Sequence, residues 1–108
     1  MTIENKYLDV LENLGWVASD VNEDNSFALK KYSPAGEDYC FAAYTDTIVE
    51  DVGNEAEYFD IDEHVMIWAD RRGYNGVPDT IRELLDDAEA IKAMLNELAD
   101  ALENVQGN

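Results

Sequence analysis

The C-terminal quarter of this chain is the feature that most limits its fold. Between Ile81 and Val105, apolar residues recur at spacings of three and four, which is the period of one face of an α-helix. Thr80 or Asp79 can cap the start of such a helix, and Gly107 lies just past its end. The members of this apolar stripe are Ile81, Leu84, Ala88, Ile91, Leu95, Leu98, Leu102 and Val105. The sequence therefore predicts one long amphipathic helix.

This stripe allows two interpretations. Its spacing follows a heptad, which is the pattern of a coiled-coil dimer. Leu85 and Met94 widen the apolar face beyond the two heptad positions of such a seam, and a wide face is typical of a helix that covers its own domain. We favour packing on the same domain, with a homodimer through part of this helix as the alternative.

The first half of the chain predicts one helix followed by a small sheet. Apolar residues at helical spacing run from Ile3 to Leu14, with Thr2 as the expected N-cap and Gly15 as the stop. Aromatic and β-branched residues then alternate with turn-rich segments. We expect three short antiparallel strands near residues 16–21, 26–33 and 38–45.

Helical spacing returns after residue 45. Asp46 is the expected cap of one helix and Asp60 of the next, in which Trp68 completes an apolar face that we expect to be buried. Two glycines and Pro78 in residues 73–78 break the chain before the last helix. The prediction is a single α+β domain over residues 1–108, of order αβββααα, whose three-stranded sheet is covered by the long C-terminal helix.

The net charge of the chain is its second outlying feature. It carries 25 acidic against 7 basic residues among 108, a formal charge of −18, whereas small domains typically carry a charge of about 2–8 in magnitude. With 46% hydrophobic residues, the chain has enough apolar surface to fold. Direct binding to nucleic acid or to an anionic membrane is disfavoured, because phosphate contacts need Lys and Arg.

The sequence also bears on location. No apolar stretch reaches the roughly 18 residues of a membrane span, and we expect no signal peptide. Cys40 is the single cysteine, so an intramolecular disulfide is impossible and a cytoplasmic location is expected. Because Cys40 lies in an apolar run, we expect its thiol to be buried.

Few residues of the chain suggest catalysis. His64 is the single histidine, and a nucleophilic pair with Cys40 would need an accessible, electropositive setting that the sequence does not indicate. The acids of residues 60–64 lack the spacing of a calcium loop and suit the first turn of a helix. We predict no catalytic residue, no cofactor and no metal site.

The acidic residues instead suggest a binding surface. No basic residue occurs between Lys31 and Arg71, a span with eleven acids. On helix faces such carboxylates lie about 5–10 Å apart, a scale similar to that of DNA phosphates, so they could occupy a basic groove that binds DNA. A solvated, solubilising face is the alternative. The candidate partner-binding residues are Glu50, Asp51, Glu55, Glu57, Asp86, Asp87 and Glu89.

Three stretches carry a resemblance: residues 33–38 (SPAGED), residues 59–68 (FDIDEHVMIW), and Gly76-Val77-Pro78 followed by residues 81–88 (IRELLDDA). Together they resemble small acidic proteins of phages and conjugative elements of gut Gram-positive bacteria, over roughly residues 27–105. The resemblance implies a mobile-element setting, in which anti-restriction and anti-CRISPR inhibitors are common and often mimic DNA. It carries over no catalytic residue. The expected function is a non-enzymatic inhibitor that binds a protein with a basic, nucleic-acid-binding groove; the alternative is an assembly module that dimerises through the last helix.

Overall fold

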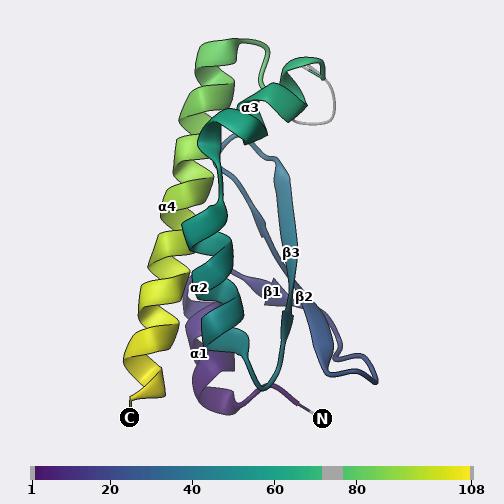
Figure 1. Ribbon diagram of the computed structural model, residues 1–108, viewed down its shortest axis with the longest axis vertical. Coiled ribbons are helices and arrows are strands. Elements are labelled where there is room, and N and C mark those ends of the chain that lie inside the picture. The colour runs from purple at the N-terminus through teal and green to yellow at the C-terminus, as the bar shows by residue number, and fades with distance from the viewer. Residues whose placement is uncertain (1, 72–76, 108) are drawn as a thin grey trace.

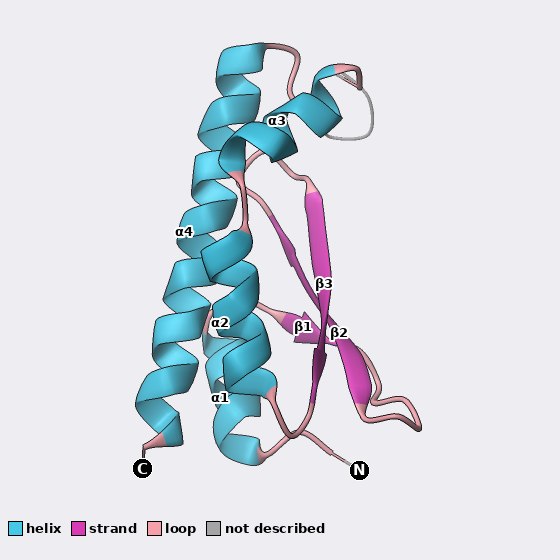
Figure 2. Cartoon of the chain, viewed as in Figure 1, coloured by secondary structure: helices cyan, strands magenta, loops and turns pink. Residues whose placement is uncertain are grey.

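The computed structural model describes residues 2–71 and 77–107, which form a three-stranded antiparallel sheet with helices on one face (Figure 1, Figure 2). The strand order is β1-β2-β3. This confirms the α+β class and the order αβββααα. The elements are α1 (Asn5–Asn13), β1 (Val17–Ala18), β2 (Ser26–Tyr32), β3 (Asp38–Tyr44), α2 (Ile48–Tyr58), α3 (Ile61–Ala69) and α4 (Ile81–Gln106).

Alternation along the strands separates the two faces of the sheet. β2 and β3 pair over their whole length, from Ser26 opposite Tyr44 to Tyr32 opposite Asp38. Successive side chains of a strand point to opposite faces, and Phe27 and Leu29 of β2 are buried on the inner face. Phe41 of β3 is buried on the same face. The inner face therefore forms one wall of the core.

The long helix α4 forms the opposite wall. Its buried residues Ile91, Leu95, Leu98 and Leu102 have no exposed surface and join the strand residues in one apolar cluster. Helices α1 and α2 pack beside α4 and complete the cover of the sheet. The interpretation that this helix covers its own domain is confirmed.

Two of the expected helix caps are confirmed and two are wrong. The Asp60 carboxylate accepts a hydrogen bond from the Glu63 backbone N–H at 3.1 Å, and the Thr80 hydroxyl oxygen accepts one from the Glu83 N–H at 3.1 Å. Thr2 and Asp46 do not cap, because α1 begins after Glu4 and α2 after Thr47.

Two lysines bind the C-terminal ends of helices that lie far from them in the sequence. Lys31 donates to the Leu14 carbonyl oxygen, just after α1, at 2.6 Å. Lys92 of α4 donates to the carbonyl oxygens of Ala56 and Glu57, the latter at 3.3 Å. A cation at this end of a helix satisfies free carbonyl groups and interacts favourably with the helix dipole. Lys31 and Lys92 are thus engaged within the fold.

Two burial predictions are wrong. Cys40 is exposed, because Phe41 and Ala43 take the inner positions of β3 and Cys40 alternates with them. Trp68 is only half-buried and lies outside the core cluster. The same holds for the whole of α3, none of whose residues is buried. The predicted break between α3 and α4 lies largely in residues 72–76, outside the described residues.

Candidate partner-binding surface

The seven candidate acids fall into two groups in the structure. Glu50, Glu57, Asp86 and Glu89 are exposed. The other three, Asp51, Glu55 and Asp87, are half-buried or buried and hold hydrogen bonds within the chain. Spacing along the sequence could not distinguish these groups.

Asp51 and Glu55 stabilise the junction between β3 and α2. The Asp51 carboxylate accepts hydrogen bonds from the Tyr44 backbone N–H and the Thr47 hydroxyl, both at 2.8 Å. Glu55 accepts a hydrogen bond from the Tyr39 hydroxyl. Burial raises the pKa of Tyr39, and the hydrogen bond to Glu55 raises it further. Both acids therefore have structural partners on the fold itself.

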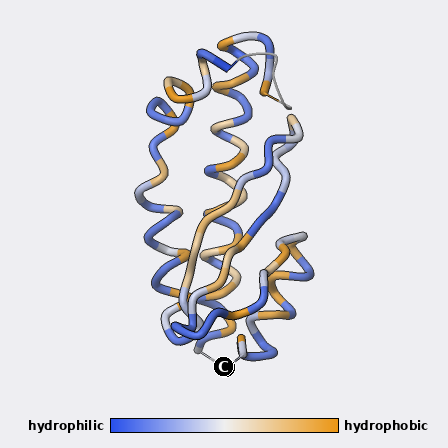
Figure 3. The backbone as a smooth tube through the Cα atoms, turned by 90° about the vertical axis from the view of Figure 1, so that its right-hand side faces the viewer, coloured by the Kyte–Doolittle hydropathy of each residue, from blue (hydrophilic) through white to orange (hydrophobic). Residues whose placement is uncertain are grey.

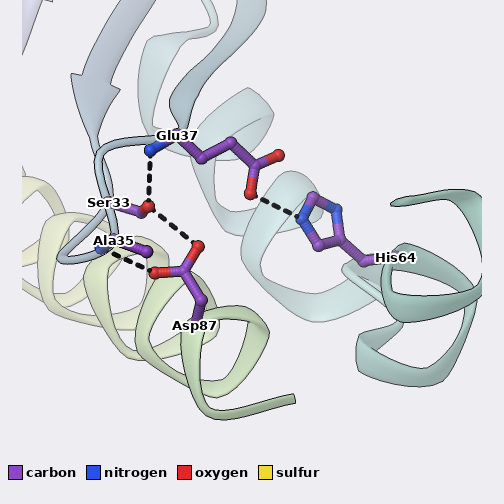
Figure 4. Close-up of polar contacts among 5 residues, drawn as sticks. All are labelled: Ser33, Ala35, Glu37, His64 and Asp87. Atoms are coloured by element: carbon purple, nitrogen blue, oxygen red, sulfur yellow. Dashed lines mark hydrogen bonds and ion pairs between the residues drawn. The ribbon is translucent and has the colours of Figure 1, made fainter. Parts of the chain in front are cut away.

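Asp87 is not a surface residue, and its assignment to the binding surface is wrong. It is 5% exposed, because it faces the turn between β2 and β3. Its carboxylate accepts hydrogen bonds from the Ser33 hydroxyl at 2.8 Å and from the Ala35 backbone N–H at 3.1 Å (Figure 4).

The turn that Asp87 binds is itself closely hydrogen-bonded. Gly36 has a φ of +92°, a left-handed conformation that glycine adopts without strain. The Glu37 backbone N–H donates to the Ser33 hydroxyl oxygen at 3.0 Å. The carboxylate of Glu37 lies 3.2 Å from His64 Nε2 of α3 (Figure 4). Residues 33–37, His64 and Asp87 thus meet in one polar network.

The geometry of this network does not suit nucleophilic catalysis. The Ser33 hydroxyl donates to Asp87 and His64 contacts Glu37, so the single histidine does not lie against this hydroxyl as the base of a serine–histidine pair. Ser33, Glu37 and Asp87 are each at most 7% exposed. Within residues 2–71 and 77–107, no three His, Cys, Asp or Glu side chains come together as metal ligands. We interpret the network as a tie between the turn, α3 and α4.

Asp87 provides a stability test of this interpretation. Replacing Asp87 by Ala leaves the Ser33 hydroxyl and the Ala35 N–H without their acceptor, so the free energy of unfolding is expected to fall by about 2–4 kcal/mol. Asp87→Asn keeps one acceptor oxygen and is expected to cost less. Denaturant unfolding measures both. A loss below about 0.5 kcal/mol for Asp87→Ala would contradict the assigned role.

The pH dependence of the same residue has a defined sign. Burial raises the pKa of Asp87 above its ordinary value of 3.8, and the hydrogen bonds from Ser33 and Ala35 oppose that shift. The stability from this group is therefore fully present below pH 3.8 and is lost as pH rises through the raised pKa. Wild type should gain stability relative to Asp87→Asn as pH falls from neutral toward 4. A difference that stays constant would contradict this.

Two of the four exposed candidate acids, Glu57 and Glu89, line a hollow where α2, α3 and α4 meet. This hollow has a volume of about 570 Å³ and is lined by Glu57 of α2 and Glu89 of α4. Asp60 and Asp62, at the start of α3, line it as well. Its apolar side chains are Tyr58, Phe59, Ile61 and Leu85. The structure thus places two predicted acids beside two that the sequence assigned only to a helix start.

The acidic surface continues along α4. A helix of 26 residues is about 39 Å long, and α4 runs along the 42 Å axis of the molecule (Figure 1). Its exposed carboxylates are Glu83, Asp86, Glu89, Glu97, Asp100 and Glu103. Lys92 of the same helix binds carbonyl oxygens of α2, so its positive charge does not offset these exposed carboxylates. Glu50 lies apart, beside Glu4 and Asp46 around a hollow of about 260 Å³.

The sequence could not predict how α2 packs along α4. Glu57 and Glu89 are 32 positions apart in the chain, and only the packing of these helices places them around one hollow. The start of α3 was predicted from the Asp60 cap. On that basis Asp60 and Asp62 could have been added to the candidate partner-binding residues.

Comparison with protein families, with curated proteins and with solved structures found no match to this chain. Among the helices within residues 2–71 and 77–107, none combines the length and the apolar character that crossing a membrane requires.

Proposed function

We propose that this chain is a non-enzymatic binding protein whose acidic surface occupies the basic, nucleic-acid-binding groove of another protein. We define the acidic surface by the four exposed acids Glu50, Glu57, Asp86 and Glu89, together with Asp60 and Asp62, which share a hollow with Glu57 and Glu89. Binding there would exclude DNA or RNA from the partner, as an anti-restriction or anti-CRISPR inhibitor does. The proposed setting is the cytoplasm of a bacterium that carries a mobile element.

The observation that carries this proposal is the convergence of carboxylates from three helices around one hollow. Glu57, Asp62 and Glu89 come from α2, α3 and α4. A row of fixed negative charges attracts a basic groove by the electrostatic term that draws DNA into it. These carboxylates lie on helices, so binding does not have to order the backbone that carries them, which favours affinity.

The alternative, an assembly module that dimerises through α4, has less support. Its seam would need the apolar stripe, but Leu84, Ala88, Ile91, Leu95, Leu98 and Leu102 are at most 2% exposed within one copy of the chain. Dimerisation through this stripe would require α4 to leave its own core.

The experiment is to capture partners from a bacterial lysate and to measure their binding to the chain at two salt concentrations. Binding by several carboxylates to a basic groove should weaken about 10-fold or more between 50 and 200 mM salt. Duplex DNA or RNA, whichever the partner binds, should compete. Binding that is insensitive to salt, or a ternary complex with the nucleic acid, would contradict the proposal.

A further inference from the structure

The hollow where α2, α3 and α4 meet exposes apolar side chains as well as carboxylates. Residues 57–62, where α2 ends and α3 begins, line it together with Leu85 and Glu89 of α4. Tyr58 is 76% exposed and Leu85 is 37% exposed. Figure 3 shows hydrophilic and hydrophobic residues following each other closely along the helices. Charge is therefore only part of what this hollow offers to a partner.

Contacts within the fold hold the lining of this hollow in place. The centroid of the Phe59 ring lies 5.7 Å from that of Tyr39 and 5.1 Å from that of His64. Leu85 and Glu89 are four positions apart on α4, so they share one face of that helix. A partner that enters the hollow meets apolar surface on an ordered backbone, which lowers the entropy cost of binding.

Tyr58 also lines a second hollow, which lies between α2 and β3. This hollow has a volume of about 280 Å³ and is lined by Tyr44, Asp51 and Glu55 as well. The Tyr58 side chain is therefore shared by two hollows that both contain carboxylates. An occupant that covers this ring is adjacent to both hollows, which suits a polypeptide segment better than a single small cation.

We propose that these two hollows bind an amphipathic basic segment of the partner protein, in which Lys or Arg residues flank an apolar side chain. The apolar side chain packs against Tyr58 and Leu85, and the cationic side chains reach the carboxylates of Glu57 and Glu89. This inference rests on the proposed function, because the segment belongs to the basic groove of the partner. It adds an apolar contact that distinguishes one basic protein from another.

Charge complementarity selects a basic occupant, and the apolar lining selects an amphipathic one. The four acids that line the first hollow are all exposed, and Lys92 does not offset them because it binds carbonyl oxygens of α2. A cation over the Tyr58 ring gains from a cation–π interaction in addition to the carboxylates. A polyamine or a metal ion would use the carboxylates alone and would leave Tyr58 and Leu85 in water.

Two synthetic peptides of equal charge test the proposal on the wild-type chain. One carries Arg and Leu residues on neighbouring faces of a helix, and in the other every Leu is replaced by Gln, which has a similar helix propensity. Isothermal titration calorimetry is carried out in physiological salt, where attraction between distant charges is largely screened. The Leu peptide should bind with a Kd about 10-fold lower or more, because it buries apolar surface. Equal Kd values would overturn the proposal.

Substitutions locate the apolar contact. Tyr58→Ser combined with Leu85→Ala should abolish the preference for the Leu peptide. Tyr32→Ser is the matched control, because Tyr32 is 62% exposed on β2 and lines neither hollow, so this variant should keep the preference. Circular dichroism confirms that both variants are folded. A folded double variant that still prefers the Leu peptide, or an equal loss in Tyr32→Ser, would overturn the proposal.

The ratio of the two peptide Kd values separates this inference from the proposed function. Glu57→Gln with Glu89→Gln should raise the Kd of both peptides by similar factors and leave their ratio unchanged, because it removes charge and keeps the apolar lining. The same Kd for both peptides would remove the apolar contact alone. The proposed function depends on a different measurement, the salt-sensitive binding of the captured partner and its loss when the acidic surface is neutralised.

Discussion

Replacing Leu98 by Ala is expected to lower the free energy of unfolding by about 3–5 kcal/mol. Leu98 has no exposed surface and lies in the core cluster between α4 and the inner face of the sheet. Its removal loses apolar burial and leaves a cavity that packed neighbours fill only in part. Since a domain of this size is stable by about 5–15 kcal/mol, the variant should lie close to its unfolding transition.

Leu85 supplies the matched control. It belongs to the same helix but is 37% exposed, so Leu85→Ala should cost less than about 1 kcal/mol. Denaturant unfolding followed by circular dichroism measures both variants. If Leu98→Ala costs no more than Leu85→Ala, α4 does not cover the sheet through its apolar stripe and the described core is wrong.

The parts of the fold that the sequence predicts are those with a local period. The stripe from Leu84 to Leu102 and the alternation around Phe27 and Phe41 repeat within a few residues, so each needs only its neighbours to be recognised. The caps Asp60 and Thr80 are also local, because the side chain and the N–H that it binds are three positions apart.

The parts that the sequence does not predict depend on packing between distant segments. The exposure of Asp87 is decided by the 33–37 turn, which lies 50 or more positions away. Asp86, its neighbour, is exposed, because adjacent helix positions point 100° apart. A cluster of acids on a helix therefore mixes structural and free carboxylates, and only the tertiary structure separates them.

Cys40 and Trp68 show a related limit. Both lie in runs rich in apolar residues, which favour burial on average. Alternation along β3 places Cys40 on the uncovered face of the sheet, and the half-buried Trp68 contacts His64 and Arg71 through its ring instead of joining the core. Hydrophobic content predicts that a segment is ordered, but register and helix placement decide which of its residues are buried.

Neutralising the acidic surface is expected to have the largest effect on binding. The variant Glu50→Gln, Glu57→Gln, Asp86→Asn and Glu89→Gln changes only exposed side chains, so the fold should persist. Each carboxylate contributes on the order of 1 kcal/mol or less. Together they should weaken binding to the captured partner by about 100-fold or more, since each 1.4 kcal/mol is tenfold in Kd.

A second variant separates the position of the charges from their number. Asp9→Asn, Glu12→Gln, Asp20→Asn and Glu23→Gln also neutralise four exposed acids, but on α1 and on the connection between β1 and β2. Both variants therefore change the formal charge from −18 by the same amount. If net charge alone drives binding, the two variants should weaken it equally.

The most direct test of the acidic surface is the Kd of wild type and of these two variants for the captured partner, with circular dichroism to confirm folding. A loss of about 100-fold for the acidic-surface variant and less than about 10-fold for its matched control is the predicted result. Equal losses, or no loss in a folded acidic-surface variant, would contradict the proposal that this surface binds the partner.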